Sequence, residues 1–273
     1  MTKIRLYDKI FSHASCVGNN YETAPKHFEW VRSGPDLPVC VFTDFSLGDV
    51  SKCTGEKKVA WLVESPEVFP GPYEQIVKLA DAFDVVLTFD GRLLERGPKF
   101  RRYYLGGCWI RRPKVGKKRK DVSIIASNKQ TTIGQKMRQE ILATVEGIDK
   151  YGRGTNEIAG KGDGLWPYRF SIAVENCRKD FYFTEKIVDC FATGTVPIYW
   201  GCPSIAAMFD GNGIARFDTL GELRAILHRI ETTDDYTWRL PAIRNNFENA
   251  KRYMNTEDCL WEDWLQAIVE GVA

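Results

Sequence analysis

The chain of 273 residues is long enough for two domains of moderate size, each with its own hydrophobic core. Hydrophobic residues make up 44% and charged residues 27% of the sequence, and the formal net charge of +2 gives no overall field that would favour nucleic acid or an anionic membrane. The first residues interleave charged and apolar side chains, so we expect no signal peptide, and no apolar run approaches the roughly 20 residues that span a bilayer. The sequence predicts a soluble or cytoplasmic protein without a nucleic-acid partner.

The eight cysteines are scattered along the chain, and no two of them form a Cys-x-x-Cys pair. Several lie in apolar runs, where a free thiol behaves as a small hydrophobic group. This pattern favours buried free thiols in a reducing compartment over a disulfide framework or a structural zinc site. The cysteines are Cys16, Cys40, Cys53, Cys108, Cys177, Cys190, Cys202 and Cys259.

Short apolar runs alternate with helical patterns in the first part of the chain. Strands separated by helices are typical of parallel βαβ units, so we predict an α/β domain over residues 1–115. The predicted strands are Lys3–Tyr7, Val39–Thr43, Val59–Val63 and Val85–Phe89, and the predicted helices include Tyr21–Arg32 and Tyr73–Ala82.

The alternation breaks at Arg111–Lys120, where seven of ten residues are basic. A proline and a glycine interrupt this run, and no aromatic residue is interleaved with it. These features favour a solvated linker between domains. The alternative, which stays open, is a weak contact with phosphate groups or with an anionic membrane surface.

A second alternating series predicts another α/β domain over residues 121–255, followed by a C-terminal helix over 256–273. The glycine-rich stretch Tyr151–Gly164 is expected to be a flexible loop. Two α/β domains of this kind form a cleft, and ligands bind beyond the carboxyl ends of the strands in open α/β sheets. The predicted elements are the strands Val122–Ser127, Phe170–Val174 and Thr195–Trp200, the helices Ile133–Val145 and Thr184–Thr193, and a largely helical remainder from Leu220.

One strand of this second series ends in two polar residues, Glu175 and Asn176, which either begin a turn or line a site. The next helix begins after Thr184, a favourable N-cap, and has Glu185 and Lys186 in its first turn. An acid there complements the helix dipole, whereas a lysine opposes it by roughly 0.3–1 kcal/mol. The position of Lys186 therefore indicates that an anion such as a diphosphate binds at this helix N-terminus.

Several elements in this region carry a resemblance to a known family. They are Tyr168-Arg169-Phe170, Glu175-Asn176, Tyr182-x-Thr184-Glu185-Lys186 and Val196–Gly201, in this order over some 37 residues that end at Ser204. Together they resemble the donor-binding signature of the α-1,3-fucosyltransferases, glycosyltransferase family 10. The resemblance implies a GT-B-like α/β architecture, with two Rossmann-like domains facing a cleft. It also implies an inverting transfer of fucose from GDP-fucose to a hydroxyl group of a glycan, with no obligatory metal ion or other cofactor.

In this family an asparagine, a tyrosine, a glutamate and a lysine of the signature contact the donor. The resemblance assigns these functions to Asn176, Tyr182, Glu185 and Lys186. The glutamate typically binds the fucose hydroxyl groups, while the lysine and the tyrosine face the diphosphate. For Tyr182, an aromatic position in the core remains the alternative.

The family also places an arginine for the diphosphate in the helix that follows Ser127-Asn128. The spacing here leaves two competing residues, Lys136 and Arg138. We favour Arg138, because a guanidinium group binds phosphate through two parallel hydrogen bonds. A solvated position on the helix surface is the alternative for this residue.

Inverting transfer needs a group that takes the proton of the acceptor hydroxyl. Glu64 follows a predicted strand in the first domain, at a place comparable to that of a catalytic glutamate in the family, so we predict that Glu64 is the base. Glu67 and Asp90 are the fallback candidates, and a carboxylate that only caps a strand end is the alternative. His13 lies in a loop after the first strand, where a surface or core histidine is the simpler interpretation.

Two other functions stay open at this point. Much of the signature recognises the diphosphate rather than the sugar, so the donor is GDP-fucose or another GDP-sugar. The alternative to an enzyme is a relative that binds a glycan or a nucleotide without turnover, because the first domain matches the family poorly.

Overall fold

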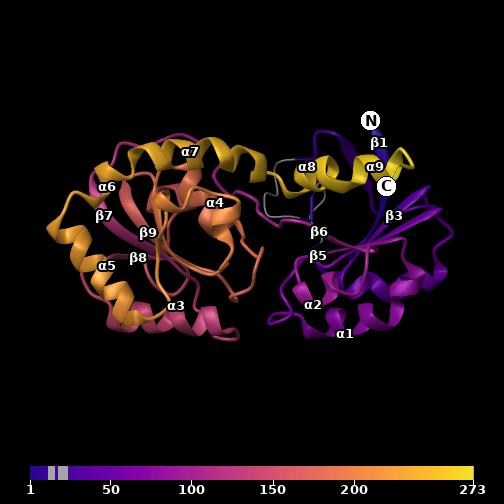
Figure 1. The fold of residues 1–273 in the computed structure, drawn as a ribbon, viewed down its shortest axis with the longest axis horizontal. Coiled ribbons are helices and arrows are strands. Elements are labelled where there is room, and N and C mark those ends of the chain that lie inside the picture. The colour runs from indigo at the N-terminus through magenta and orange to yellow at the C-terminus, as the bar shows by residue number, and fades with distance from the viewer. Residues whose placement is uncertain (12–15, 18–23, 273) are drawn as a thin grey trace. The chain divides into compact units, whose positions relative to one another are not determined.

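A computed structural model describes residues 1–11, 16, 17 and 24–272. The chain divides into two compact units: unit 1 comprises Met1–Leu105 and Asn255–Ala273, and unit 2 comprises Gly106–Met254 (Figure 1). His13 and the beginning of the predicted helix Tyr21–Arg32 lie outside the described residues. None of the helices in the described part of the chain combines the length and the apolar character that a membrane span requires.

Unit 1 is built on a parallel sheet, which over the described residues has six strands in the order β2-β1-β3-β4-β5-β6. The central strand β3 is buried at every position, as expected for a parallel sheet that is covered on both faces. The strands are β1 (Thr2–Tyr7), β2 (Phe28–Val31), β3 (Val39–Thr43), β4 (Lys57–Trp61), β5 (Val85–Thr88) and β6 (Phe100–Arg102).

Helices lie on both faces of this sheet (Figure 1). The C-terminal segment packs within unit 1, where Trp261 stacks on Phe28 with ring centroids 5.6 Å apart and Trp264 Nε1 donates to the Arg102 carbonyl over 2.8 Å. The α-helices are α1 (Pro70–Leu79), α2 (Gly91–Leu94), α8 (Thr256–Leu260) and α9 (Gln266–Val269), with a π-helical turn at Trp261–Leu265 and 3-10 turns at Asp44–Lys52 and Ala80–Ala82.

The prediction of a helix over Tyr21–Arg32 is wrong for its described C-terminal part, because Phe28–Val31 forms β2. Phe28 and Trp30 are buried while Glu29 between them is exposed, so the burial has the period of two that is typical of a strand. The predicted strands of this half and the helix at Tyr73–Ala82 are confirmed, with bounds shifted by a few residues.

Unit 2 contains a parallel sheet that has five strands in the described residues, in the order β11-β10-β9-β7-β8. Its central strand β9 carries the buried run from Phe170 to Val174, and α4 packs against both β9 and β10. The strands are β7 (Lys120–Ile125), β8 (Asp149–Tyr151), β9 (Tyr168–Val174), β10 (Val196–Trp200) and β11 (Ala215–Arg216).

The helices of unit 2 bury apolar faces against this sheet. Ile141 of α3, Ile226 of α5 and Ile243 of α7 belong to one hydrophobic core with Phe170 and Ile198 of the strands. In Figure 1, α3 lies on one side of the sheet and α7 on the other. The helices are α3 (Ile133–Thr144), α4 (Glu185–Ala192), α5 (Leu220–Thr232), α6 (Asp235–Trp238) and α7 (Leu240–Ala250), with 3-10 turns at Lys161–Gly164, Ile205–Ala207, Gly211–Gly213 and Lys251–Tyr253.

The predicted elements of this half are confirmed, with one correction. The glycine-rich stretch Tyr151–Gly164, expected to be a loop, contains the end of β8 and the 3-10 turn Lys161–Gly164. Two of its glycines permit close packing: a Cβ atom on Gly152 would lie 2.0 Å from the Ala126 carbonyl oxygen. A Cβ atom on Gly162 would lie 2.4 Å from the Trp166 ring.

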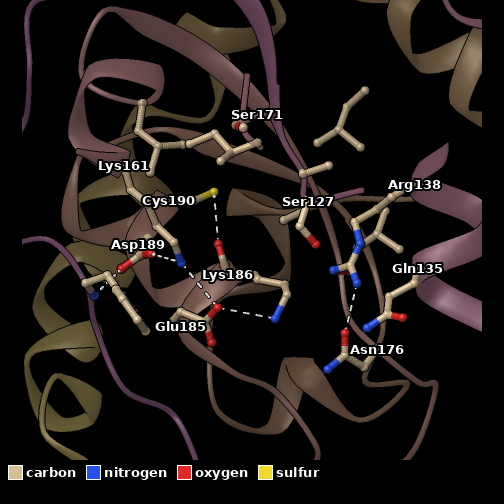
Figure 2. A pocket seen from close by; sticks show the side chains of 18 of the residues that line it. Ser127, Gln135, Arg138, Lys161, Ser171, Asn176, Glu185, Lys186, Asp189 and Cys190 are labelled. Atoms are coloured by element: carbon tan, nitrogen blue, oxygen red, sulfur yellow. Dashed lines mark hydrogen bonds and ion pairs between the residues drawn. The ribbon is translucent and has the colours of Figure 1, made fainter. Parts of the chain in front are cut away.

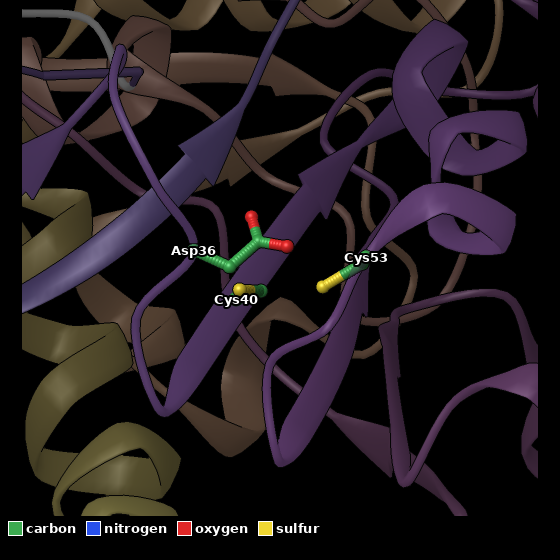
Figure 3. Close-up of side chains that lie close together, drawn as sticks. All are labelled: Asp36, Cys40 and Cys53. Atoms are coloured by element: carbon green, nitrogen blue, oxygen red, sulfur yellow. The ribbon is translucent and has the colours of Figure 1, made fainter.

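The cysteines are buried free thiols, as predicted. Two of them, Cys40 and Cys53, form a cluster with Asp36 in unit 1, with their donor atoms within 4.8 Å of one another (Figure 3). Asp36 accepts hydrogen bonds from the Tyr7 hydroxyl and from the Thr54 amide (2.7 Å) and hydroxyl (3.1 Å).

These contacts show that the cluster ties the connections around β3 together. The Cys40 thiol donates to the Leu37 carbonyl over 3.3 Å, and burial raises its pKa to about 12. A metal ion would need the thiolate and the Asp36 oxygens that protein donors already occupy, so we assign the cluster to the stability of unit 1.

The basic run Arg111–Lys120 is mostly exposed, as expected of a solvated segment, but it is not a linker between domains, because it belongs to unit 2 and packs on it. The amides of Lys114 and Gly116 donate to the carbonyl groups of Ala192 and Thr193, at 3.0 and 3.2 Å. Lys118 Nζ donates to the Thr193 carbonyl and to Thr195 Oγ1, both at 2.9 Å. The last carbonyl groups of a helix lack partners within the helix, and the run supplies donors to them, so it covers the end of α4.

Lys118 should give the stability of the protein a specific pH dependence. Burial lowers the pKa of its ammonium group from the usual 10.5 to about 7. Between these two values the unfolded chain binds a proton that the folded chain does not, so the free energy of unfolding rises with pH in this interval. Urea unfolding of Lys118→Met should show a smaller rise from pH 7 upward than the wild type, by about 1–3 kcal/mol.

Lys117→Met is the control, because Lys117 is exposed and next to Lys118 in the chain. Equal pH dependence in the wild type and Lys118→Met would show that Lys118 stays charged in the folded protein.

Candidate functional site

The Glu175 carboxylate fixes the junction between β9 and α4. Glu175 follows the last residue of β9 and is fully buried. Its carboxylate accepts hydrogen bonds from the amide of Thr184 at 3.0 Å and from the hydroxyl of Thr184 at 2.7 Å. Thr184 is the N-cap of α4, so Glu175 places the first turn of this helix at the carboxyl ends of the strands. Glu175 therefore does more than begin a turn.

Lys186 lies in the first turn of α4, as predicted, but protein groups already surround its charge. Its Nζ atom lies 3.0 Å from Thr184 Oγ1, 3.3 Å from Glu185 Oε1 and 3.6 Å from Glu175 Oε2. The two carboxylates offset part of the repulsion between the lysine and the helix dipole. The position of Lys186 alone therefore does not show that an anion binds here. The charges of all residues that line the pocket have to be considered.

A pocket of about 520 Å³ opens beside this junction (Figure 2). It is bordered by the ends of β7 and β9, the first turns of α3 and one face of α4. Five cationic side chains line it against two carboxylates, so it carries excess positive charge. The charged lining residues are Lys129, Arg138, Arg153, Lys161 and Lys186, with Glu185 and Asp189.

Arg138 is a buried cation in this pocket, with only 6% of its surface exposed. Its NH1 and NH2 groups donate to the Val174 carbonyl (2.7 Å) and to Asn176 Oδ1 (2.9 Å), while its buried Nε–H has no hydrogen-bond partner among the described residues. No carboxylate in the described part of the chain lies within ion-pair distance of it, and burial lowers its pKa. The charges of Glu175 and Glu185 offset only part of the cost of burial, because the pKa of Arg138 remains lowered. A buried guanidinium that lacks a direct ion pair is costly, which is the arrangement expected where an anionic ligand binds.

The structure separates the two competing cations of α3. Lys136 is exposed and does not line the pocket, whereas Arg138 does. Arg138 shares the buried face of α3 with Gly134 and Ile141, and this face packs on β9.

Close approach of α3 to β9 depends on Gly134. Its amide donates to the Asn176 carbonyl over 3.2 Å, and a Cβ atom there would lie 1.7 Å from the Glu175 carbonyl oxygen. A capping box of Thr132 and Gln135 closes the helix start. Asn176 thereby links the N-terminus of α3 to Arg138.

A second charge network lies deeper in the pocket, on α4. Lys161 Nζ lies 3.2 Å from Glu185 Oε1 and 3.0 Å from Asp189 Oδ2, and Asp189 Oδ1 accepts the Trp109 amide over 2.6 Å (Figure 2). Lys161, Asp189 and Trp109 are functional candidates that were not predicted from the sequence. The available signal for Asp189 was its position four residues after Glu185, on the same face of the helix.

Of the predicted donor-binding residues, the structure brings Arg138, Asn176, Glu185 and Lys186 together in the pocket. Tyr182 is fully buried and is not among the residues that line it. Its function as a donor contact stays a prediction.

Glu64 lies in unit 1, just after β4, and is half-buried. Its amide donates to Asp44 Oδ2 over 3.2 Å, and its Oε1 accepts the Ser65 amide over 2.8 Å. Asp44 is a buried carboxylate with a φ of 26°, and burial raises its pKa to about 7. Glu64 thus stands beside a second acid at the carboxyl edge of the sheet.

The fallback bases have different surroundings. Asp90 is the N-cap of α2, where its side chain accepts the amides of Arg92 and Leu93, so it is already engaged. Glu67 is exposed. Glu64 remains the preferred candidate for the base.

Comparison with known proteins identifies one family over much of the chain. Residues 115–260 match glycosyltransferase family 10 (fucosyltransferase), C-terminal part. The α-(1,3)-fucosyltransferase FucT of Helicobacter pylori is 34% identical over 97 residues, which are 34% of this chain and 20% of that protein. GDP-fucose protein O-fucosyltransferase 3 of Homo sapiens is 31% identical over 87 residues, which are 29% of this chain and 18% of that protein. The chain thus matches only about a fifth of each relative.

Solved structures support the fold over nearly the full chain. A crystal structure of an α1,3-fucosyltransferase with GDP has a TM-score of 0.61 at 18% identity and covers 98% of this chain and 90% of its own. A second structure of such an enzyme, with GDP-fucose, has a TM-score of 0.56 at 17% identity, with 90% and 80% covered. The predicted GT-B-like α/β fold with parallel sheets is confirmed.

Gly134→Ala should destabilise the protein by about 1–3 kcal/mol or more, because the added methyl group forces α3 away from β9. Gly221→Ala is a matched control, since Gly221 is likewise the second residue of its helix, α5, and has no atom closer than 3.8 Å to an added Cβ. It should stabilise by about 0.4–1 kcal/mol. Urea unfolding measures both, and equal effects of the two substitutions would contradict the packing argument.

Proposed function

The chain belongs to glycosyltransferase family 10 (fucosyltransferase), and from this premise we propose that it transfers fucose from GDP-fucose, with inversion, to a hydroxyl group of a glycan. The observation that carries the proposal is the buried Arg138, which has no carboxylate of the described residues within ion-pair distance, in a pocket with five cations and two carboxylates. The pocket volume of about 520 Å³ also lies in the range of small-molecule sites.

Arg138 and Lys186 bind the diphosphate in this proposal. The Nε–H of Arg138 lacks a hydrogen-bond partner in the part of the chain that the structure describes, and a phosphate oxygen would supply one. As the bond from C1 of the sugar to the diphosphate oxygen breaks, negative charge grows on GDP, and fixed cations stabilise it without reorganisation. Because these side chains supply that charge, the proposal needs no obligatory metal ion.

Glu185 accepts hydrogen bonds from the sugar hydroxyl groups, and Asn176 holds Arg138 in place through its side-chain oxygen. We keep Tyr182 in the donor-binding set by its place in the family signature. Since its side chain is fully buried, a contact with the diphosphate would require it to rotate toward the pocket.

The acceptor oxygen attacks C1 while Glu64 takes its proton, and GDP leaves. Glu64 is suited to this function because it is half-buried and lies after β4, at the carboxyl edge of its sheet, where a carboxylate can take a proton from a hydroxyl group. The names of the relatives, an α-(1,3)-fucosyltransferase and a GDP-fucose protein O-fucosyltransferase, support fucose as the sugar. Another GDP-sugar, or binding without turnover, is a distinct outcome of the experiments below.

Part of the basic run Arg111–Lys120 stays available for a weak contact with an anionic membrane surface. Lys118 is engaged with α4, but Arg112 and Lys117 are exposed. The net charge of +2 gives no reason to propose a nucleic-acid partner.

Isothermal titration calorimetry should show that GDP binds at least about tenfold more tightly than UDP. Lys186→Met should weaken GDP binding by about 10-fold or more, because one charge-assisted contact with the diphosphate is lost. Lys136→Met, which changes an exposed lysine of α3, should leave it unchanged. Equal affinities for UDP and GDP would refute the proposed donor.

Glu64→Gln should lower the rate of fucose transfer by about 10²–10⁴-fold, since the amide cannot accept the proton, and should leave GDP affinity unchanged. Glu67→Gln serves as the control for a nearby exposed acid. Transfer onto a panel of glycans measures the rates, and full activity of Glu64→Gln would assign the base elsewhere. A wild type that binds GDP-fucose but transfers nothing to any acceptor would favour the non-catalytic alternative.

A further inference from the structure

Resting on the proposed function, we propose that Lys161 is a positioning residue that fixes the Glu185 carboxylate for the sugar of the donor. Lys161 is part of no motif of the signature and comes from the glycine-rich stretch 24 residues before Glu185. It acts through Glu185 rather than through a contact of its own with the reacting atoms.

Lys161 is anchored on three sides. Its Nζ atom lies 3.0 Å from Asp189 Oδ2, 3.2 Å from Glu185 Oε1 and 5.0 Å from the centre of the Trp109 ring (Figure 2). Trp109 in turn donates its amide to the other oxygen of Asp189. Lysine side chains carry much rotamer freedom, and these contacts remove it.

The position of Lys161 follows from the local backbone. It is the first residue of the 3-10 turn Lys161–Gly164 and stands between Gly160 and Gly162. Any side chain at Gly162 would meet the Trp166 ring, at 2.4 Å from a Cβ atom. The tight turn against Trp166 therefore directs the Lys161 side chain toward α4.

Lys161 reduces the repulsion between two carboxylates on α4. Glu185 and Asp189 are four residues apart on one helix face, where two carboxylates repel each other. Burial and the charge of Glu185 leave the pKa of Asp189 above its usual range. Burial also raises the pKa of Glu185, but Lys161 and then Lys186 more than offset this, so it lies well below the usual range. The surroundings therefore favour the ionised form of Glu185 more strongly than that of Asp189.

The geometry leaves one oxygen of Glu185 outside these ion pairs. Lys161 and Lys186 both contact Oε1, at 3.2 and 3.3 Å. The two ion pairs fix the orientation of the carboxylate. Its other oxygen, Oε2, can then accept hydrogen bonds from hydroxyl groups of the sugar. Loss of Lys161 would free the rotation of Glu185 and raise its pKa.

The test is a double-mutant cycle of Lys161→Met and Glu185→Gln, read by calorimetry with GDP and with GDP-fucose. Lys161→Met should weaken GDP-fucose binding by about tenfold and change GDP binding by less than about twofold. In the Glu185→Gln background, Lys161→Met should have no further effect. Lys161→Arg should restore most of the affinity, and Lys150→Met, at a half-buried lysine that donates to the Leu142 carbonyl, is the matched control.

A second measurement needs no ligand. The pKa of the Glu185 carboxylate, followed by NMR of the labelled side chain, should rise in Lys161→Met and stay low in Lys161→Arg. If Lys161→Met does not fold, Asp189→Asn replaces it, since it removes an anchor of Lys161 and leaves an amide oxygen for Trp109.

The outcomes separate the two proposals. Equal weakening of GDP and GDP-fucose by Lys161→Met, additive effects in the cycle, or an unchanged pKa of Glu185 would overturn the positioning function of Lys161. A wild type that binds neither nucleotide would overturn the proposed function, while the pKa measurement would still report on the contact between Lys161 and Glu185.

Discussion

The arrangement of unit 2 depends on one buried group, the carboxylate of Glu175. Burial of an isolated carboxylate is strongly unfavourable, and burial raises its pKa. Two hydrogen bonds from Thr184 and the ammonium group of Lys186 offset this cost. Because Thr184 caps α4, the same bonds that satisfy Glu175 set the direction of the helix that carries Glu185, Lys186 and Asp189. A single buried group thereby couples the end of β9 to the chemistry of the pocket.

Much of the fold could be predicted from the sequence because its strands are central and parallel. Val39–Thr43 and Val196–Trp200 are buried at every position and read as short apolar runs between helical patterns. The short strand Phe28–Val31 was mistaken for a helix, because four residues at the edge of a sheet give little periodicity. The basic run was mistaken for a linker, because composition does not reveal that its amides pair with the end of α4.

The candidate site could be predicted only where its residues are close in the chain. Asn176, Glu185 and Lys186 lie within eleven residues and share a recognisable order. Lys161 could not be found this way, because its partners meet it only after the chain folds. The choice of Arg138 over Lys136 could be predicted from helix periodicity. Arg138 lies on the same helix face as Ile141, and Ile141 packs into the core. The charge of Lys186 is balanced in part by Glu175 and Glu185, and the sequence does not reveal this because Glu175 reaches Lys186 only in the folded chain.

The path of the chain has a consequence for how this protein can be divided. Unit 1 is assembled from two separate stretches, and Trp261 near the C-terminus covers Phe28 near the N-terminus. Unit 2 is an uninterrupted insertion between them. A single truncation therefore cannot give both units intact. Removal of all residues after 254 would take away the helices of unit 1 that cover Phe28. A chimera that exchanges unit 2 for the corresponding unit of a relative needs two junctions, one near residue 106 and one near residue 254.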